Sequence, residues 1–180
     1  PMSSLAYQII GTFVLVLVNA FFVLAEFAIV KVRDTRVAEL AATGKRTARV
    51  LHHIVGHLDA YLSATQLGVT VASLGLGWLG ASAFTDLFGL AVNKAIAAVL
   101  AFILVTFVTI ILGELVPKSF AIRKAETSSL VIALPLRWFY LITRPLTWLM
   151  YISTVGILKL FRIQPASERD LAYSEEELRM

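Results

Sequence analysis

The sequence of 180 residues contains no cysteine and few charged side chains. Without cysteine, disulfides and thiolate metal sites are excluded. Charged residues make up 16% of the chain, whereas soluble domains have roughly 25%. The long apolar stretches also carry no His-Glu-x-x-His motif, aspartate dyad or nucleophile–base pair. We therefore expect a protein that is neither disulfide-stabilised nor an enzyme.

Apolar residues are abundant, at 58% of the chain, with a mean hydropathy of +0.81. These values predict a membrane protein, and 180 residues are enough for one domain. The net charge is +4, but the basic residues flank apolar stretches. They therefore indicate lipid headgroups as partners and not nucleic acid.

Three stretches satisfy the rule of about 20 apolar residues per membrane-spanning helix. They are residues 5–30, 61–80 and 95–116. A fourth apolar region, 129–163, contains prolines, arginines and tryptophans, a mixture typical of the headgroup layer. We expect helices that lie along the interface there, with a short fourth span over 146–160 as the alternative.

The fold class predicted is an all-α membrane protein. Residues 1–165 form the transmembrane domain, and 166–180 begin an acidic helical linker. Between the first two spans, residues 33–57 are amphipathic and predict two interfacial helices with a break at Gly44. Pro1 before Met2 is expected to be a remnant, and the acidic run is expected to continue into a soluble part.

Lysine and arginine are distributed unevenly between the loops. Many follow the first and third spans, whereas only Lys94 lies between the second and third. Basic loops remain cytoplasmic. The N-terminus is therefore predicted outside and the C-terminus in the cytoplasm.

Polar residues within the spans form narrow stripes. At 100° per residue, those of the first span lie within about 40° of one another. The stripes comprise Gln8, Thr12, Asn19 and Glu26 in the first span, Ser63, Gln66, Thr70, Ser73, Gly77 and Gly80 in the second, and Thr106, Thr109, Gly113 and Glu114 in the third. A polar seam between helices explains Gln8 and Thr12, and close helix packing explains Gly77 and Gly80.

Glu114 is the most informative of these residues, because a carboxylate at membrane depth costs several kcal/mol. Pro117 has no N–H for the carbonyl of Gly113, so that oxygen is expected to be free beside the carboxylate. Adjacent oxygen ligands in a dry environment suit a hard cation. The alternative is an ion pair between Glu114 and Lys118, one helical turn later.

Together the stripes predict an oxygen-lined cation site without sulfur, which suits Mg²⁺ or Na⁺ better than zinc or copper. Pro117 is expected to break the helix, and Lys118 to act as the charge partner that orients or neutralises Glu114 when the site is empty. The candidate metal ligands are Glu114, Ser73, Thr70, Asn19 and the backbone carbonyls near Gly113 and Ala25. Three further polar residues are candidates for the second coordination shell or for a Na⁺ site: Glu26, Gln66 and Ser63. For Glu26 the alternative is an ion pair with Lys31 or Lys118.

Three segments, 18–28, 62–70 and 113–119, resemble the transmembrane domain of the CorC/CNNM family of Mg²⁺ transporters. The resemblance covers nearly the whole chain and implies a homodimer with three spans per protomer and a belt of juxtamembrane helices. It further implies an inward-facing Mg²⁺ cavity in the plasma (inner) membrane, Mg²⁺ export coupled to Na⁺, and cytoplasmic CBS domains that bind ATP. Those CBS domains would follow the acidic linker.

Two positions depart from the family pattern. Many members carry Ser near Ala25 and Asn near Ser73, so Ala25 can offer only its carbonyl and Ser73 only a hydroxyl. The predicted function is Na⁺-coupled Mg²⁺ transport by alternating access. The alternative is a membrane-anchored Mg²⁺ sensor or regulator of another transporter, and a channel is less expected because a single carboxylate site behind a kinked helix suits occlusion.

Overall fold

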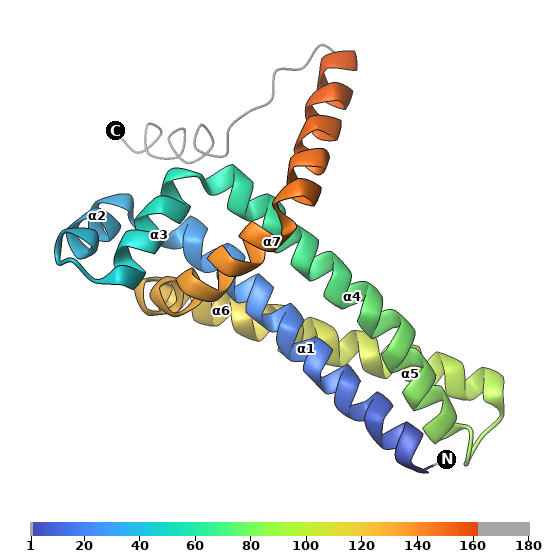
Figure 1. Ribbon diagram of the computed structural model, residues 1–180. Coiled ribbons are helices and arrows are strands. Elements are labelled where there is room, and N and C mark those ends of the chain that lie inside the picture. The colour runs from blue at the N-terminus through green and yellow to red at the C-terminus, as the bar shows by residue number, and fades with distance from the viewer. Residues whose placement is uncertain (1, 162–180) are drawn as a thin grey trace, which may run out of the picture. The chain divides into compact units, whose positions relative to one another are not determined.

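The computed structural model describes residues 2–161, with side chains from residue 5, and every element in that range is a helix. The all-α prediction is therefore confirmed, while the predicted linker 166–180 lies outside the described residues. The elements are α1 (Met2–Lys31), α2 (Asp34–Ala42), α3 (Arg46–Gly56), α4 (Leu58–Phe88), α5 (Lys94–Val108), the π-helical segment η1 (Thr109–Leu115), α6 (Val116–Arg123) and α7 (Ala125–Leu160) (Figure 1).

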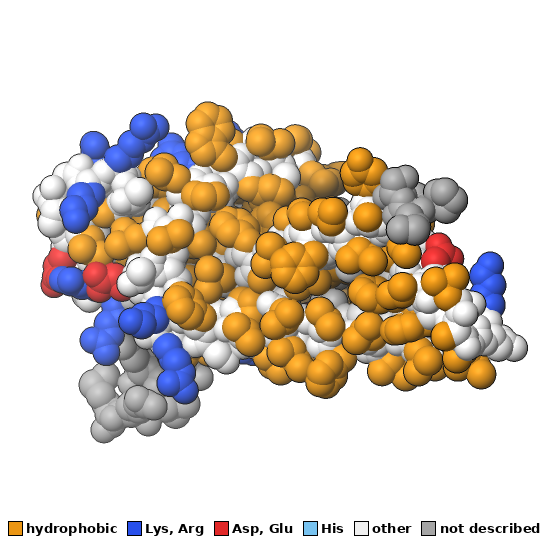
Figure 2. Space-filling view, turned by 90° about the horizontal axis from the view of Figure 1, so that it is seen from below, with side chains coloured by type: hydrophobic (Ala, Val, Ile, Leu, Met, Phe, Trp, Pro, Cys, Tyr) orange, Lys and Arg blue, Asp and Glu red, His pale blue; other side chains and the backbone are white. Residues whose placement is uncertain are grey.

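Four of these helical stretches are long and apolar enough to cross a membrane, which makes the chain a multi-pass membrane protein. They are Leu5–Lys31, Leu58–Phe88, Lys94–Arg123 and Ala125–Leu160. The first three contain the three predicted spans. The fourth is α7, which has the lowest mean hydropathy, 1.3, and which the sequence assigns to the interface. Hydrophobic side chains cover most of the face in Figure 2.

The chain divides into two compact units. The first comprises Pro1–Val32 and Thr65–Ile132, and the second Arg33–Ala64 and Ala133–Met180. In the first unit, α1 lies along η1 and α6. The first unit thus contains all of the predicted metal ligands.

Glycines allow the helices of the first unit to approach closely. A Cβ atom on Gly68 of α4 would lie 2.5 Å from the ring of Phe22 on α1. On Gly80 it would lie 3.1 Å from Val105 of α5. Close packing at Gly80 is confirmed, but the same expectation for Gly77 is wrong, because a Cβ there meets nothing within 4 Å.

The third predicted span is irregular before Pro117. Over Thr109–Leu115 the backbone hydrogen bonds change from the α-helical to the π-helical pattern. At the end of this segment, the N–H of Val116 donates to the carbonyl of Ile111, five residues earlier. Pro117 follows in the first turn of α6 and is buried. The interruption predicted from proline is therefore a π-helical segment, a feature that often accompanies functional sites.

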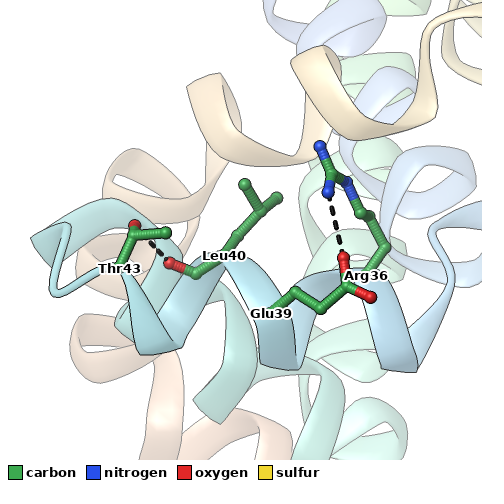
Figure 3. Close-up of polar contacts among 4 residues, drawn as sticks. All are labelled: Arg36, Glu39, Leu40 and Thr43. Carbon is green, nitrogen blue, oxygen red and sulfur yellow. Dashed lines mark hydrogen bonds and ion pairs between the residues drawn. The ribbon is translucent and has the colours of Figure 1, made fainter.

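In the second unit, α2 and α3 meet at the predicted break, where Gly44 has a φ of 82°. A left-handed residue commonly ends a helix. Along α2, Arg36 pairs with Glu39 at 3.0 Å, and the Thr43 hydroxyl donates to the carbonyl of Leu40 at 2.7 Å (Figure 3). The two helices bury apolar side chains, including Val37, Val50, Leu51 and Ile54.

Where several helices are expected over 129–163, the described part of that region, up to residue 161, is one helix, α7, which ends at Leu160. Pro135 and Pro145 lie inside it without ending it. Near Pro145, the Thr143 and Thr147 hydroxyls donate to main-chain carbonyls at 2.9 and 3.0 Å. These hydroxyls donate to the carbonyls of Phe139 and Arg144 and not to that of Leu141, which is the carbonyl that Pro145 leaves without its helical N–H donor.

Candidate functional site

The candidate site centres on Asn19, a fully buried side chain on α1. Its Nδ2 donates to the carbonyl oxygen of Gly113 in η1 at 3.1 Å. The Ser73 hydroxyl on α4 donates to its Oδ1 at 3.2 Å. The amide thereby joins three of the predicted ligands, one from each predicted span.

Physical chemistry explains why these three groups meet. A buried amide among apolar helices must be hydrogen-bonded, since leaving it unpaired costs about 1–3 kcal/mol. Gly113 permits the contact, because a Cβ atom there would lie 2.9 Å from Asn19 Nδ2. A side chain at position 113 would therefore displace the amide.

The carbonyl of Gly113 is not free, as the sequence led us to expect, but accepts a hydrogen bond from Asn19. It nevertheless keeps some capacity to bind a cation, since a carbonyl oxygen has two lone pairs. The same holds for Asn19 Oδ1, which accepts one bond from Ser73. The network thus brings together two carbonyl-type oxygens, those of Gly113 and Asn19, and the hydroxyl oxygen of Ser73.

Thr109 was named in the third-span stripe but not among the candidate ligands. Its hydroxyl oxygen is buried and has no hydrogen-bond partner in the described residues. Its Cγ2 lies 3.6 Å from the Cβ position of Gly113, which places it beside the Asn19 contact. The spacing of four residues between Thr109 and Gly113 was the available signal, because such residues share a helix face.

Glu114 follows Gly113 in η1 and is exposed. Among the described residues, neither an ion pair nor a hydrogen bond joins it to Lys118 or to Asn19. The Lys118 ammonium instead lies 4.4 Å from the centroid of the Phe27 ring, a cation–π contact. The alternative of a Glu114–Lys118 ion pair is therefore not realised in this structure.

The remaining candidates are not joined to Asn19 by any hydrogen bond in the described part of the chain. The Thr70 hydroxyl is exposed and donates to the carbonyl of Gln66, itself an exposed residue, at 2.8 Å. Ala25 is fully buried, and Glu26 is half-buried. These residues stay predictions.

Ser63 belongs to the second unit and not the first. Its hydroxyl donates to the carbonyl of Asp59 at 2.9 Å. Ser63 also lines a cavity of about 440 Å³, together with Tyr140 and Arg144 of the same unit. Its placement gives no support to a role beside Asn19.

The donors limit which ion could bind. In residues 2–161, no three His, Cys, Asp or Glu side chains gather as a metal-binding group. A cation at Asn19 would therefore meet neutral oxygens and at most the one neighbouring carboxylate of Glu114. Such a donor set suits hard ions such as Mg²⁺ or Na⁺, not zinc.

Comparison with known proteins agrees with this architecture. Residues 10–180 match the family model described as the cyclin M transmembrane N-terminal domain. The chain is 44% identical to UPF0053 protein YrkA of Bacillus subtilis, over 92% of this chain and 40% of that protein. It is 45% identical to YhdT of the same organism, over 93% of this chain and 38% of that protein. The similarity extends to plants.

In Arabidopsis thaliana, the DUF21 domain-containing protein At1g55930 is 28% identical over 93% of this chain and 24% of that protein. The chain therefore spans less than half the length of these relatives. The family match covers nearly all of its residues, including every candidate ligand. From its helices and this match, the chain belongs to the family of cyclin M transmembrane N-terminal domains.

Proposed function

We propose that this domain transports Mg²⁺ across the membrane by alternating access, with Na⁺ as the counter-ion. The observation that carries the proposal is the buried contact of Asn19 with Gly113 and Ser73, and Glu114 follows Gly113 directly in the sequence. An apolar bundle has little structural need for a buried contact between oxygen-bearing groups from three different helical segments. Intramembrane polar groups of this kind usually mark ion pathways.

In the proposed mechanism, Glu114 supplies the negative charge and the other groups supply neutral oxygens. Binding of the cation draws in Asn19 Oδ1 and turns the Ser73 hydroxyl so that its lone pair faces the ion. The carbonyl of Gly113 uses its second lone pair, and Thr70 and the Ala25 carbonyl complete the shell. Mg²⁺ favours about six oxygens near 2.1 Å, and bound water can supply any that are missing.

The remaining parts of the proposal concern topology and assembly. The N-terminus lies outside the plasma (inner) membrane and the C-terminus in the cytoplasm, as supported by the basic residues that follow α1 and η1. The domain functions as a homodimer, and α7 lies along the interface. In the longer protein, CBS domains that bind ATP follow the acidic linker.

The test is Mg²⁺ flux through the purified protein in liposomes, measured with an encapsulated Mg²⁺ indicator. We expect flux that rises when a Na⁺ gradient is imposed. Flux that ignores the Na⁺ gradient would remove the counter-ion from the proposal. Mg²⁺ binding without any flux would favour the alternative function, a membrane-anchored Mg²⁺ sensor or regulator.

A further inference from the structure

A second cluster of functional side chains lies in the second unit, apart from the predicted metal ligands. It surrounds a cavity of about 510 Å³ between α3 and α7, a size common among ligand sites. Arg46 and Arg49 stand three residues apart on α3, and therefore on one helix face. From α7 come Arg137 and three apolar residues at helical spacing, Leu134, Trp138 and Leu141.

The charge of this cavity is unbalanced. Three guanidinium groups line it, and none of its lining residues is acidic. The positive charge is also felt by His53 on α3, whose pKa is lowered by burial, by His57 and by Arg137. Three like charges around one hollow repel each other unless an anion lies between them, and the planar guanidinium binds phosphate oxygens in pairs.

The cavity also has an apolar side, which a free phosphate ion would not contact. Trp138 is 65% exposed and Leu141 is 49% exposed. Large exposed apolar side chains beside arginines are typical of the layer where lipid headgroups meet acyl chains. The occupant should therefore combine a phosphate with a hydrocarbon chain.

We propose that this cavity binds an anionic phospholipid, with the headgroup phosphate held by Arg46, Arg49 and Arg137 and the acyl chain lying over Trp138 and Leu141. Basic pockets at the cytoplasmic membrane surface bind anionic headgroups in this way. The site is distinct in residues and chemistry from the proposed Mg²⁺ site. Its failure would leave the transport proposal intact.

The experiment measures how strongly brominated lipids quench Trp138. The sequence has three tryptophans, so Trp78→Phe with Trp148→Phe leaves Trp138 alone. The purified protein is placed in phosphatidylcholine vesicles that contain increasing fractions of brominated phosphatidylglycerol, and brominated phosphatidylcholine serves as the reference. We expect phosphatidylglycerol to be preferred at Trp138 by at least about tenfold, given three arginines.

Arginine variants then locate the site. Arg49→Gln and Arg137→Gln should each lower the preference by about fivefold. Arg49→Lys should lose a smaller part of it, because lysine keeps the charge but not the paired hydrogen bonds of the guanidinium. The matched control is Arg33→Gln, which removes the same charge from an exposed position outside the cavity. Equal losses in Arg33→Gln and Arg137→Gln would overturn the proposal, because a diffuse positive field would then explain the preference.

Two further measurements complete the test, a folding control and a competition with a soluble phosphate. Helical content by circular dichroism and elution volume identify any variant that fails to fold, so that the loss of lipid preference is compared only among folded variants. Glycerol 3-phosphate at millimolar concentration should leave the quenching unchanged. If it displaces the lipid, the cavity is a site for soluble phosphates and the lipid assignment is wrong.

Discussion

The two units of this protein handle polar groups in opposite ways. In the first unit the central polar group, Asn19, is fully buried and bonded to Ser73 and Gly113 from two other elements. In the second unit the polar groups include arginines that are exposed or half-buried around a cavity with an exposed tryptophan. Both contain oxygen or nitrogen groups among apolar helices, and in the first unit the Asn19 amide joins α1 to α4 and η1.

The difference indicates which solvent each unit is adapted to. Inside a bilayer no water can satisfy an amide, so polar groups must satisfy one another. At the headgroup layer, arginines can remain exposed because lipid phosphates and water satisfy them. The contrast fits the two proposals, a cation site in the first unit and an anionic-lipid site in the second.

The largest expected effect concerns Mg²⁺ itself, which should stabilise the first unit through Glu114. At a Mg²⁺ concentration 100 times its dissociation constant, binding should raise the free energy of unfolding by about 2.7 kcal/mol. Addition of a chelator should remove this gain, and Glu114→Gln should show none of it. Thermal unfolding followed by tryptophan fluorescence measures both.

The control for that prediction is Glu39→Gln, which removes a carboxylate of the second unit that pairs with Arg36 on the surface. Exposed pairs contribute about 0–1 kcal/mol. Its response to Mg²⁺ should equal that of the unmodified protein. Equal loss of the Mg²⁺ response in both variants would mean that the ion acts by general screening.

The second prediction concerns the buried hydrogen bonds of Asn19 with Gly113 and Ser73 in the first unit. Asn19→Leu keeps the volume but leaves the Gly113 carbonyl and the Ser73 hydroxyl without their partner. Each unsatisfied buried group costs about 1–3 kcal/mol, so we expect a loss of about 2 kcal/mol or more. Chemical unfolding in detergent measures it.

The matched variant in the second unit is Thr154→Val. Its hydroxyl is exposed and only donates back to Met150 of the same helix. We expect a change within about 0.5 kcal/mol. If Asn19→Leu were as mild as Thr154→Val, the buried network would not hold the helices of the first unit together.

Close helix approach gives a smaller and more local effect. Gly68→Ala places a methyl group 2.5 Å from the ring of Phe22, so the helices must separate or the ring must turn. Overpacking of this kind costs about 1–3 kcal/mol. Gly77→Ala, on the same helix and in open space, should be neutral or slightly stabilising. A similar melting temperature for the two variants would contradict the packing described for α1 and α4.

The smallest effect is expected from His53. Its pKa is lowered by burial, by His57 and by Arg137, so the folded state resists its protonation. Stability should therefore fall as the pH drops from the unfolded-state pKa, near 6.5, towards the lowered folded-state value. His53→Gln should remove a small part of that decline in thermal unfolding between pH 7 and 5. A steeper decline in the variant would reverse the sign of the effect.

Sequence patterns predicted the helices and much of the site, for identifiable reasons. Apolar length located the first three membrane helices, and the 100° periodicity placed Asn19, Ser73 and Gly113 on stripes that the structure brings together. Hydropathy could not distinguish a spanning helix from an interfacial one in α7, because its prolines and arginines are compatible with both. Proline rules predicted an interruption near Pro117 but not its π-helical form.

Two further features, the partner of Lys118 and the cavity between α3 and α7, depend on tertiary contacts that sequence periodicity does not contain. The partner of Lys118 is an aromatic ring and not Glu114, because the approach of α1 sets which group lies nearest. The cavity between α3 and α7 joins residues about 90 positions apart in the sequence. Periodicity gives the face of each helix but not which faces meet.

The most direct test of the central claim compares Mg²⁺ flux through unmodified protein and Glu114→Gln, reconstituted at equal density in the same liposomes with an outward-to-inward Na⁺ gradient. The proposal predicts robust flux in the unmodified protein and a loss of at least about tenfold in the variant, with Glu39→Gln unchanged. Equal flux through the unmodified protein and Glu114→Gln would contradict the proposal, because the Glu114 carboxylate would then play no part in moving the ion.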